Sequence, residues 1–192
     1  MISLTKGQAI SLDKDGASLK RISMGTGWDG VKKKGGFLGF GGGAAVDIDL
    51  DASALVYSSK RLVDQIWFQQ LRSKDGNIAH SGDNRTGDGD GDDETINVDL
   101  SKLDPSIDAL VFTVNSFAGQ KFDQVDNAYT RLVDLETGKE IARYSLSDSG
   151  PHTGMIMATI KRVGSGWELK AIGERAAGRT FHDMEAQIAQ HV

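Results

Sequence analysis

The 192-residue chain contains no cysteine, only two prolines and no long apolar run. The absence of cysteine excludes disulfides, thiolate metal sites and cysteine nucleophiles. Because no stretch of eighteen apolar residues is present, the sequence offers no candidate for a membrane-spanning helix. The first residues also lack the charged-then-apolar pattern of a signal peptide, and we therefore expect a cytoplasmic protein.

Basic residues are too few to give the chain an excess of positive charge, since the formal net charge is −5. A protein that binds nucleic acid needs a basic face for the phosphates, so this balance disfavours that class. We expect proteins, rather than nucleic acid, as partners.

Glycine is abundant, at 24 residues, and the apolar residues fall into many short segments of strand length. This pattern predicts an all-β chain, folded as one antiparallel β-sandwich domain over residues 1–192. Glycine-containing loops at 136–139 and 164–166 predict two hairpins. Helix is expected only near 122–127 and at the C-terminus, over 183–190. The predicted strands cover 18–24, 47–57, 62–71, 95–100, 109–114, 129–135, 140–146, 155–163 and 167–172.

Negative charge is concentrated between Asp83 and Glu94, where the chain reads D-N-R-T-G-D-G-D-G-D-D-E. Six carboxylates stand here against Arg85 alone, a local balance of −5 that equals the net charge of the whole chain. Such density is unfavourable unless the segment stays solvated or a cation collects it. The alternating glycines let the backbone aim several oxygens at one point, and oxygen ligands suit Ca²⁺ first and Mg²⁺ second.

The tract does not fit the helical EF-hand loop. Counted from Asp88, the sixth position is Asp93, where that loop needs glycine, and the twelfth is Asp99, where it needs glutamate. The flanking segments are also predicted strands. A solvated acidic loop without a metal is the alternative interpretation.

A second acidic group lies in V-D-I-D-L-D-A-S, where Asp47, Asp49 and Asp51 alternate with apolar residues. A strand would place the three carboxylates on one face, where they repel one another. A cation shared with the 83–94 tract would remove that repulsion, so we predict that the two segments meet at one end of the sandwich. Two ions are favoured, because a single Ca²⁺ would leave much negative charge uncompensated.

Other motifs give weaker signals. Residues 25–30 match G-x-G-x-x-G, but a glycine-rich loop rather than a helix is predicted to follow, so a dinucleotide site is disfavoured and Trp28 is expected in the core or at its rim. The loop at 32–43 reads K-K-K-G-G-F-L-G-F-G-G-G. It is interpreted as a surface loop or, alternatively, as a contact for a partner or for peripheral membrane association.

No residue pattern predicts catalysis. The four histidines are scattered, and His80 is expected to be an exposed turn residue or to shape the edge of the site. We expect no enzymatic activity. The alternatives left open are a metal-dependent hydrolase and a scaffold at the membrane face.

Three motifs together resemble the TerD family of tellurium-resistance and stress proteins: G-T-G-W-D at 25–29, D-I-D-L-D-A-S at 47–53, and the tract that begins at His80. The resemblance continues through I-N-V-D-L-S-K-L, F-T-V-N-S-F and E-I-A-R-Y-S-L. The W-D-x-V-K-K-K segment and the late H-T-G and G-R-T elements look most like the TerZ branch.

The resemblance implies a calcium-binding β-sandwich, usually with two Ca²⁺ ions near one end, in a stress response and together with other tellurium-resistance proteins. Asp47 is left outside the implied ligand set. Further oxygens are implied at Thr86, Asp88 and Asp90. The metal-binding oxygens that it implies fall on Asp49, Asp51, Asp83, Asn84, Asp92, Asp93 and Glu94.

Overall fold

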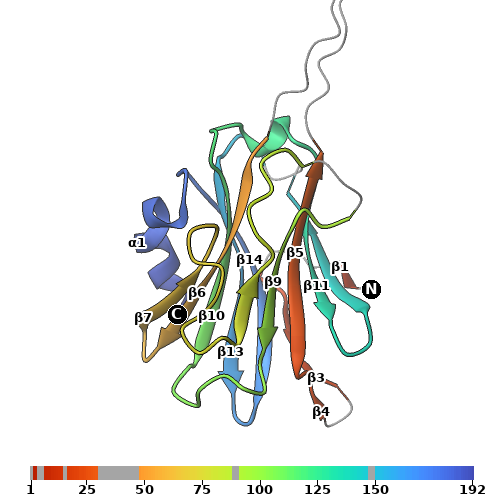
Figure 1. Ribbon diagram of the computed structural model, residues 1–192, viewed down its shortest axis with the longest axis vertical. Coiled ribbons are helices and arrows are strands. Elements are labelled where there is room, and N and C mark those ends of the chain that lie inside the picture. The colour runs from red at the N-terminus through yellow and green to blue at the C-terminus, as the bar shows by residue number, and fades with distance from the viewer. Residues whose placement is uncertain (1, 4–6, 15–16, 30–47, 88–90, 147–149) are drawn as a thin grey trace, which may run out of the picture.

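A computed structural model of the chain shows two six-stranded β-sheets packed face to face, which confirms the predicted antiparallel sandwich (Figure 1). The structure describes residues 2–3, 7–14, 17–29, 48–87, 91–146 and 150–192. Three earlier predictions fall outside these ranges: the loop at 32–43, Asp47, and the pair Asp88 and Asp90. No described helix has the length and apolar character needed to cross a bilayer.

The first sheet has the order β1-β12-β11-β5-β9-β8. Its neighbouring strands pair antiparallel, except that β1 runs parallel to β12. The strands are β1 (Ile2–Ser3), β12 (Lys139–Ser145), β11 (Asp126–Asp134), β5 (Arg21–Asp29), β9 (Glu94–Asp99) and β8 (Ile78–His80).

The second sheet has the order β2-β14-β13-β10-β6-β7 and is antiparallel throughout. Its strands are β2 (Ala9–Ser11), β14 (Gly166–Ala176), β13 (Gly154–Val163), β10 (Ala109–Ser116), β6 (Leu50–Ser58) and β7 (Arg61–Ile66). A separate two-stranded ribbon consists of β3 (Asp13–Lys14) and β4 (Ala17–Ser18).

Both predicted hairpins are present, because β11 pairs with β12 and β13 with β14. Their loops contain Gly138 at φ 67° and Gly164 at φ 59°, conformations that glycine adopts without a side-chain clash. The main core lies between the sheets, where alternate residues such as Ile22, Leu110 and Ile160 are completely buried.

A smaller apolar cluster covers the outer face of the second sheet. The chain forms η1 (Phe122–Gln124) and ends in η3 (Phe181–Met184), α1 (Glu185–Ile188) and η4 (Ala189–His191). Phe181, Met184 and Ile188 pack against Leu55 and Val111 of β6 and β10, and α1 lies beside this sheet (Figure 1). The predicted C-terminal helix is therefore present as three short helical pieces.

The C-terminal segment is also tied to β10 by a polar contact. The Asn115 Nδ2 atom donates to the Gly178 carbonyl oxygen at 3.3 Å and lies 3.5 Å from the Met184 sulfur. Asn115 pairs in register with Asp51 of β6. The end of the second sheet where β6 begins is therefore covered on its outer side by the C-terminal residues.

Candidate metal centre

The candidate site lies where β6 begins and has no partner strand on one side. The pairing of β6 with β7 starts only at Ala54, so the preceding residues have no neighbour in β7. Two side chains of the first sheet bond to the backbone there: Ala52 N donates to Glu94 Oε2 at 2.8 Å, and His80 Nε2 lies 3.2 Å from the Ala52 carbonyl oxygen. These contacts join the two sheets at one end of the sandwich.

His80 is a buried side chain of this junction and not an exposed turn residue, so that expectation was wrong. It is only 7% exposed, because the alternation along β8 turns both Ile78 and His80 inward. Gly82 N donates to His80 Nδ1 at 3.0 Å, which leaves the Nε2 proton to face the Ala52 oxygen and Glu94 Oε2, the latter at 3.3 Å. His80 therefore orients Glu94 and shapes the edge of the site, which was the second expectation for this residue.

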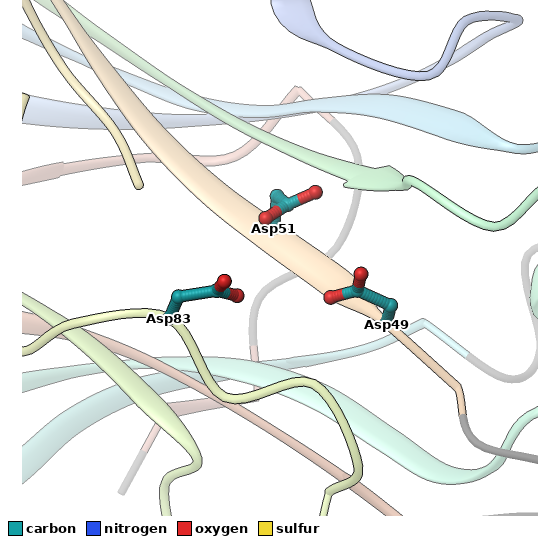
Figure 2. Close-up of side chains that lie close together, drawn as sticks. All are labelled: Asp49, Asp51 and Asp83. Atoms are coloured by element: carbon teal, nitrogen blue, oxygen red, sulfur yellow. The ribbon is translucent and has the colours of Figure 1, made fainter. Parts of the chain in front are cut away.

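Three carboxylates converge beside this junction, from segments far apart in the sequence. Asp49 and Asp51 come from the start of β6, and Asp83 comes from the loop after β8; their side chains point toward one another (Figure 2). One ligand oxygen from each lies within 4.8 Å of the others. The predicted meeting of the two acidic segments is therefore present for these three residues.

Within the described part of the chain, no lysine or arginine forms an ion pair with these three carboxylates, although the charge of Arg85 acts against the rise in the pKa of Asp49. Burial, followed by the charges of Asp49 and Glu94, raises the pKa of Asp51 to about 8. Burial and the Asp83 charge likewise raise the pKa of Asp49. Asp49 Oδ1 and Asp51 Oδ2 are both buried and accept no hydrogen bond from any residue that the structure describes. A buried carboxylate oxygen without a donor is costly, and a hard cation would satisfy both oxygens at once.

Asn84 and Asp93 lie next to this cluster and are linked to each other. Asn84 Nδ2 donates to Asp93 Oδ1 at 3.0 Å, and Asn84 N donates to Glu94 Oε1 at 3.2 Å. Asn84 Oδ1 accepts hydrogen bonds from the backbone of Thr86 and Gly87, both at 3.1 Å. Asn84 thus shapes the loop from its own side-chain oxygen, and Thr86 contributes its backbone N–H to that turn.

Asp93 faces the inner side of the loop. Its Oδ2 accepts the Trp28 backbone N–H at 2.8 Å, and burial raises its pKa. Trp28 itself is 3% exposed and donates its ring N–H to the Ile48 carbonyl oxygen at 2.8 Å, so it is a core residue as expected. These bonds connect the end of β5 to the residues that lead into β6.

Asp92 is placed differently from the other acidic residues. Its two oxygens accept hydrogen bonds from Arg131, Nε to Oδ1 at 2.8 Å and Nη2 to Oδ2 at 3.0 Å. Arg131 is the register partner of Gly25 in β5, on the outer face of the first sheet. Of the residues predicted to hold metal, the structure brings Asp49, Asp51 and Asp83 into one cluster, places Asn84, Asp93 and Glu94 beside it, and pairs Asp92 with an arginine.

Comparison with known proteins agrees with this arrangement of motifs. Residues 1–185 match the TerD domain family. The chain is 47% identical over 193 residues to the tellurium resistance protein TerZ of Serratia marcescens, covering 100% of this chain and 99% of that protein. It is 43% identical over 192 residues to the stress response protein SCP2 of Bacillus subtilis (strain 168), covering 95% of this chain and 96% of that protein.

The fold is shared with a crystal structure of a homologue of telluride resistance protein (TerD) from Streptomyces coelicolor A3(2). The TM-score is 0.70 at 25% sequence identity, over 84% of this chain and 92% of that one. The family match spans nearly the whole sequence, and the two relatives align over 99% and 96% of their own lengths. The chain belongs to the TerD domain family.

Proposed function

We propose that the chain is a calcium-binding protein of the stress and tellurium-resistance response, and that it works by binding rather than by catalysis. The observation that carries the proposal is a pair of buried oxygens next to Asp83, Asp49 Oδ1 and Asp51 Oδ2, for which the described residues supply no hydrogen-bond donor. The biological role is supported by relatives that are named for tellurium resistance and for stress response.

Calcium fits the donor set better than a softer or smaller ion. The clustered groups are carboxylates, whose oxygens suit a hard cation of high coordination number. Mg²⁺ demands a tighter octahedron and loses its water reluctantly, so we expect it to bind more weakly.

A second ion would use the other acidic residues of the loop. Asp93 and Glu94 lie beside the cluster, and the chain adds Asp88 and Asp90 between them and Asp83. We propose two ions in all, because one Ca²⁺ compensates only two of the negative charges in this region.

Calcium would act at this site by closing one end of the sandwich. Asp51 lies in β6 of the second sheet and Asp49 directly precedes that strand, whereas Asp83 follows β8 at the edge of the first sheet, so one ion bound by all three would link the sheets. The ordered end would present a surface to protein partners, for which other tellurium-resistance proteins are the candidates. The Kd for Ca²⁺, compared with the cellular Ca²⁺ concentration, decides whether the ion is a permanent structural one or the signal of a sensor.

Calorimetric titration of chelator-treated protein tests the proposal directly. We expect Ca²⁺ to bind and, at 100 times its Kd, to stabilise the fold by about 2.7 kcal/mol, or a melting temperature higher by roughly 5–10 °C. Mg²⁺ at the same concentration is the control and should give a smaller shift. An unchanged melting temperature with Ca²⁺ would reject the metal site. Turnover of a phosphoester with either ion would instead favour a hydrolase.

A further inference from the structure

The two glycines of the G-T-G-W-D motif form a close-fitting seat for the acidic loop. Gly25 and Gly27 lie in β5, in register with Arg131 and Tyr129 of β11. A Cβ atom at Gly25 would overlap the Asp92 carboxylate, and one at Gly27 would lie 2.6 Å from the Gly91 carbonyl oxygen and from the Tyr129 ring. Glycine is therefore required at both positions by the approach of residues 91–92.

The seated residues are bound by two side chains of the adjacent strand. Arg131 grips Asp92 through the two hydrogen bonds given above, a fork geometry that fixes direction as well as distance. The Tyr129 hydroxyl donates to the Gly91 carbonyl oxygen at 2.8 Å and lies 3.1 Å from Asp92 Oδ1. The Asp92 side chain is only 10% exposed, so solvent screens this ion pair weakly.

Arg131 is itself held in place by β12. Its Nη1 donates to Glu140 Oε2 at 3.2 Å, and Arg143 donates to the two oxygens of Glu140 at 3.0 and 2.8 Å. The Arg143 guanidinium also stacks 3.9 Å above the Tyr129 ring. The grip on Asp92 is therefore part of a network across two neighbouring strands, which keeps Arg131 oriented.

At the contact with Arg131, the side chains of Asp92 and Glu94 point to opposite faces of the first sheet. In an unbroken strand Asp92 and Glu94 would face the same side. Here Asp92 meets Arg131 on the outer face, whereas Glu94 is completely buried and bonds Ala52 of the opposite sheet. Between them, Asp93 N donates to the Thr26 carbonyl oxygen at 2.9 Å, at the point where β9 begins.

We propose that Asp92 is a positioning residue and not a calcium ligand. With Arg131, Tyr129 and the Gly25–Gly27 seat, it anchors the loop on the outer face and so turns Asp93 and Glu94 toward the ion-binding side. The proposal rests on the calcium site proposed above. It assigns to the G-x-G pattern the role of receiving a loop of the same chain.

Replacement of Arg131 distinguishes the two roles of Asp92 by the sign of the effect. If Asp92 is a ligand, Arg131→Gln frees its carboxylate, and Ca²⁺ binding becomes tighter. If Asp92 is the anchor, the loop loses its hold, and we expect a Kd about 10–100-fold weaker with the same number of ions bound. Asp92→Asn should give a similar loss, and the double variant should be little worse than either single one.

Arg85→Gln is the matched control, since Arg85 is an exposed arginine of the same loop. It removes the same charge near the site, and we expect unchanged or tighter binding. Tighter binding by Arg131→Gln, or loss of an ion in Asp92→Asn with normal affinity in Arg131→Gln, would overturn the anchor.

A second measurement needs no calcium and separates this proposal from the calcium site itself. In chelated protein, hydrogen exchange of the Asp93 amide reports whether its bond to Thr26 persists. We expect faster exchange in Arg131→Gln and in Asp92→Asn, but not in Arg85→Gln. Unchanged protection in all three variants would reject the anchor. Failure of the wild-type protein to bind Ca²⁺ would reject the proposed function and leave this exchange result standing.

Discussion

Asp51 and Asp92 come from the two acidic motifs and lie at the same end of the sandwich, yet their surroundings are opposite. Asp92 faces a guanidinium fork and a tyrosine hydroxyl on the outer face of the first sheet. Asp51 is 4% exposed, lies beside Asp49 and Asp83, and has one oxygen that receives no hydrogen bond from the described part of the chain. The acidic residues of the two motifs therefore do not form one site: Arg131 compensates the charge of Asp92, whereas Asp51 lies among other carboxylates, where we propose a cation.

The two surroundings also differ in how they shift the pKa values of the groups that they contain. Burial raises the pKa values of Asp49, Asp51 and Asp93, which means that each charged form is disfavoured in the metal-free fold. On the outer face, the hydrogen bond with Asp92 raises the pKa of Arg131, which favours the charged guanidinium. The charged forms of Asp49, Asp51 and Asp93 are therefore unfavourable in the metal-free fold, and bound calcium would stabilise them.

The largest effect on Ca²⁺ affinity is expected from removing the charge of Asp51. Asp51→Asn should weaken Ca²⁺ binding by at least about 100-fold, because it removes the most buried carboxylate of the cluster. The metal-free variant should be no less stable than the wild type, since the substitution also removes the repulsion among the three carboxylates. Calorimetry and thermal melts in chelator measure the two effects.

Asp104→Asn is the control for this substitution. Asp104 lies in the loop between β9 and β10, beyond the opposite end of β9 from Glu94. It should leave calcium binding unchanged. Equal affinity for Asp51→Asn and wild type would remove Asp51 from the site.

A smaller effect is expected on the pH dependence of the metal-free protein. The folded-state pKa of Asp51, about 8, lies above the unfolded-state value of about 3.8. The folded state then binds the proton more tightly, so this group's penalty is absent below about pH 4 and grows as pH rises toward 8. We expect the wild type to lose stability across this window relative to Asp51→Asn, by at most about 1.4 kcal/mol per pH unit.

Chemical denaturation at several pH values, in chelator, measures this difference between the two proteins. Saturating Ca²⁺ should abolish it in the wild type, because the ion replaces the proton as the partner of the carboxylate. Parallel pH profiles for the two chelated proteins would show that Asp51 is not disfavoured in its charged form.

The smallest expected effect tests the outer seat. Gly25→Ala places a methyl group where the Asp92 carboxylate lies, so we expect calcium affinity to fall by about tenfold without loss of an ion. Adding Asp92→Ala makes room for the methyl group, and the double variant should bind no more weakly than Asp92→Ala alone. If the double variant binds Ca²⁺ much more weakly than Asp92→Ala alone, Gly25 affects the site by some route other than its contact with Asp92.

Much of the sandwich could be predicted because its strands follow local rules. Alternation and glycine loops located β9 to β14 to within a few residues, and β5, β6 and β7 with larger errors at their ends. The error at β5 is instructive. The predicted strand ended at residue 24, but β5 continues through Gly25 and Gly27, whose small size leaves room for the loop at 91–92.

The sequence predicted which acidic segments form the site but not the direction in which each side chain points. Spacing indicated that the two acidic motifs meet, and Asp49, Asp51 and Asp83 do meet. The sequence gives no local signal that Asp92 faces outward, since that depends on Arg131, 39 residues away. The burial of His80 had only a faint signal, its position two residues after Ile78 in a short strand.

The long sequence separations at this site have a consequence for the order in which the protein is made. Every acidic residue considered as a ligand has been synthesised by Glu94, but Arg131 and Tyr129 follow only with β11. The β10 strand, which pairs with β6 at Asp51, is also made later. A chain emerging from the ribosome thus carries all the candidate ligands well before the strands that orient them exist, and the finished site can form only after β11 has been made.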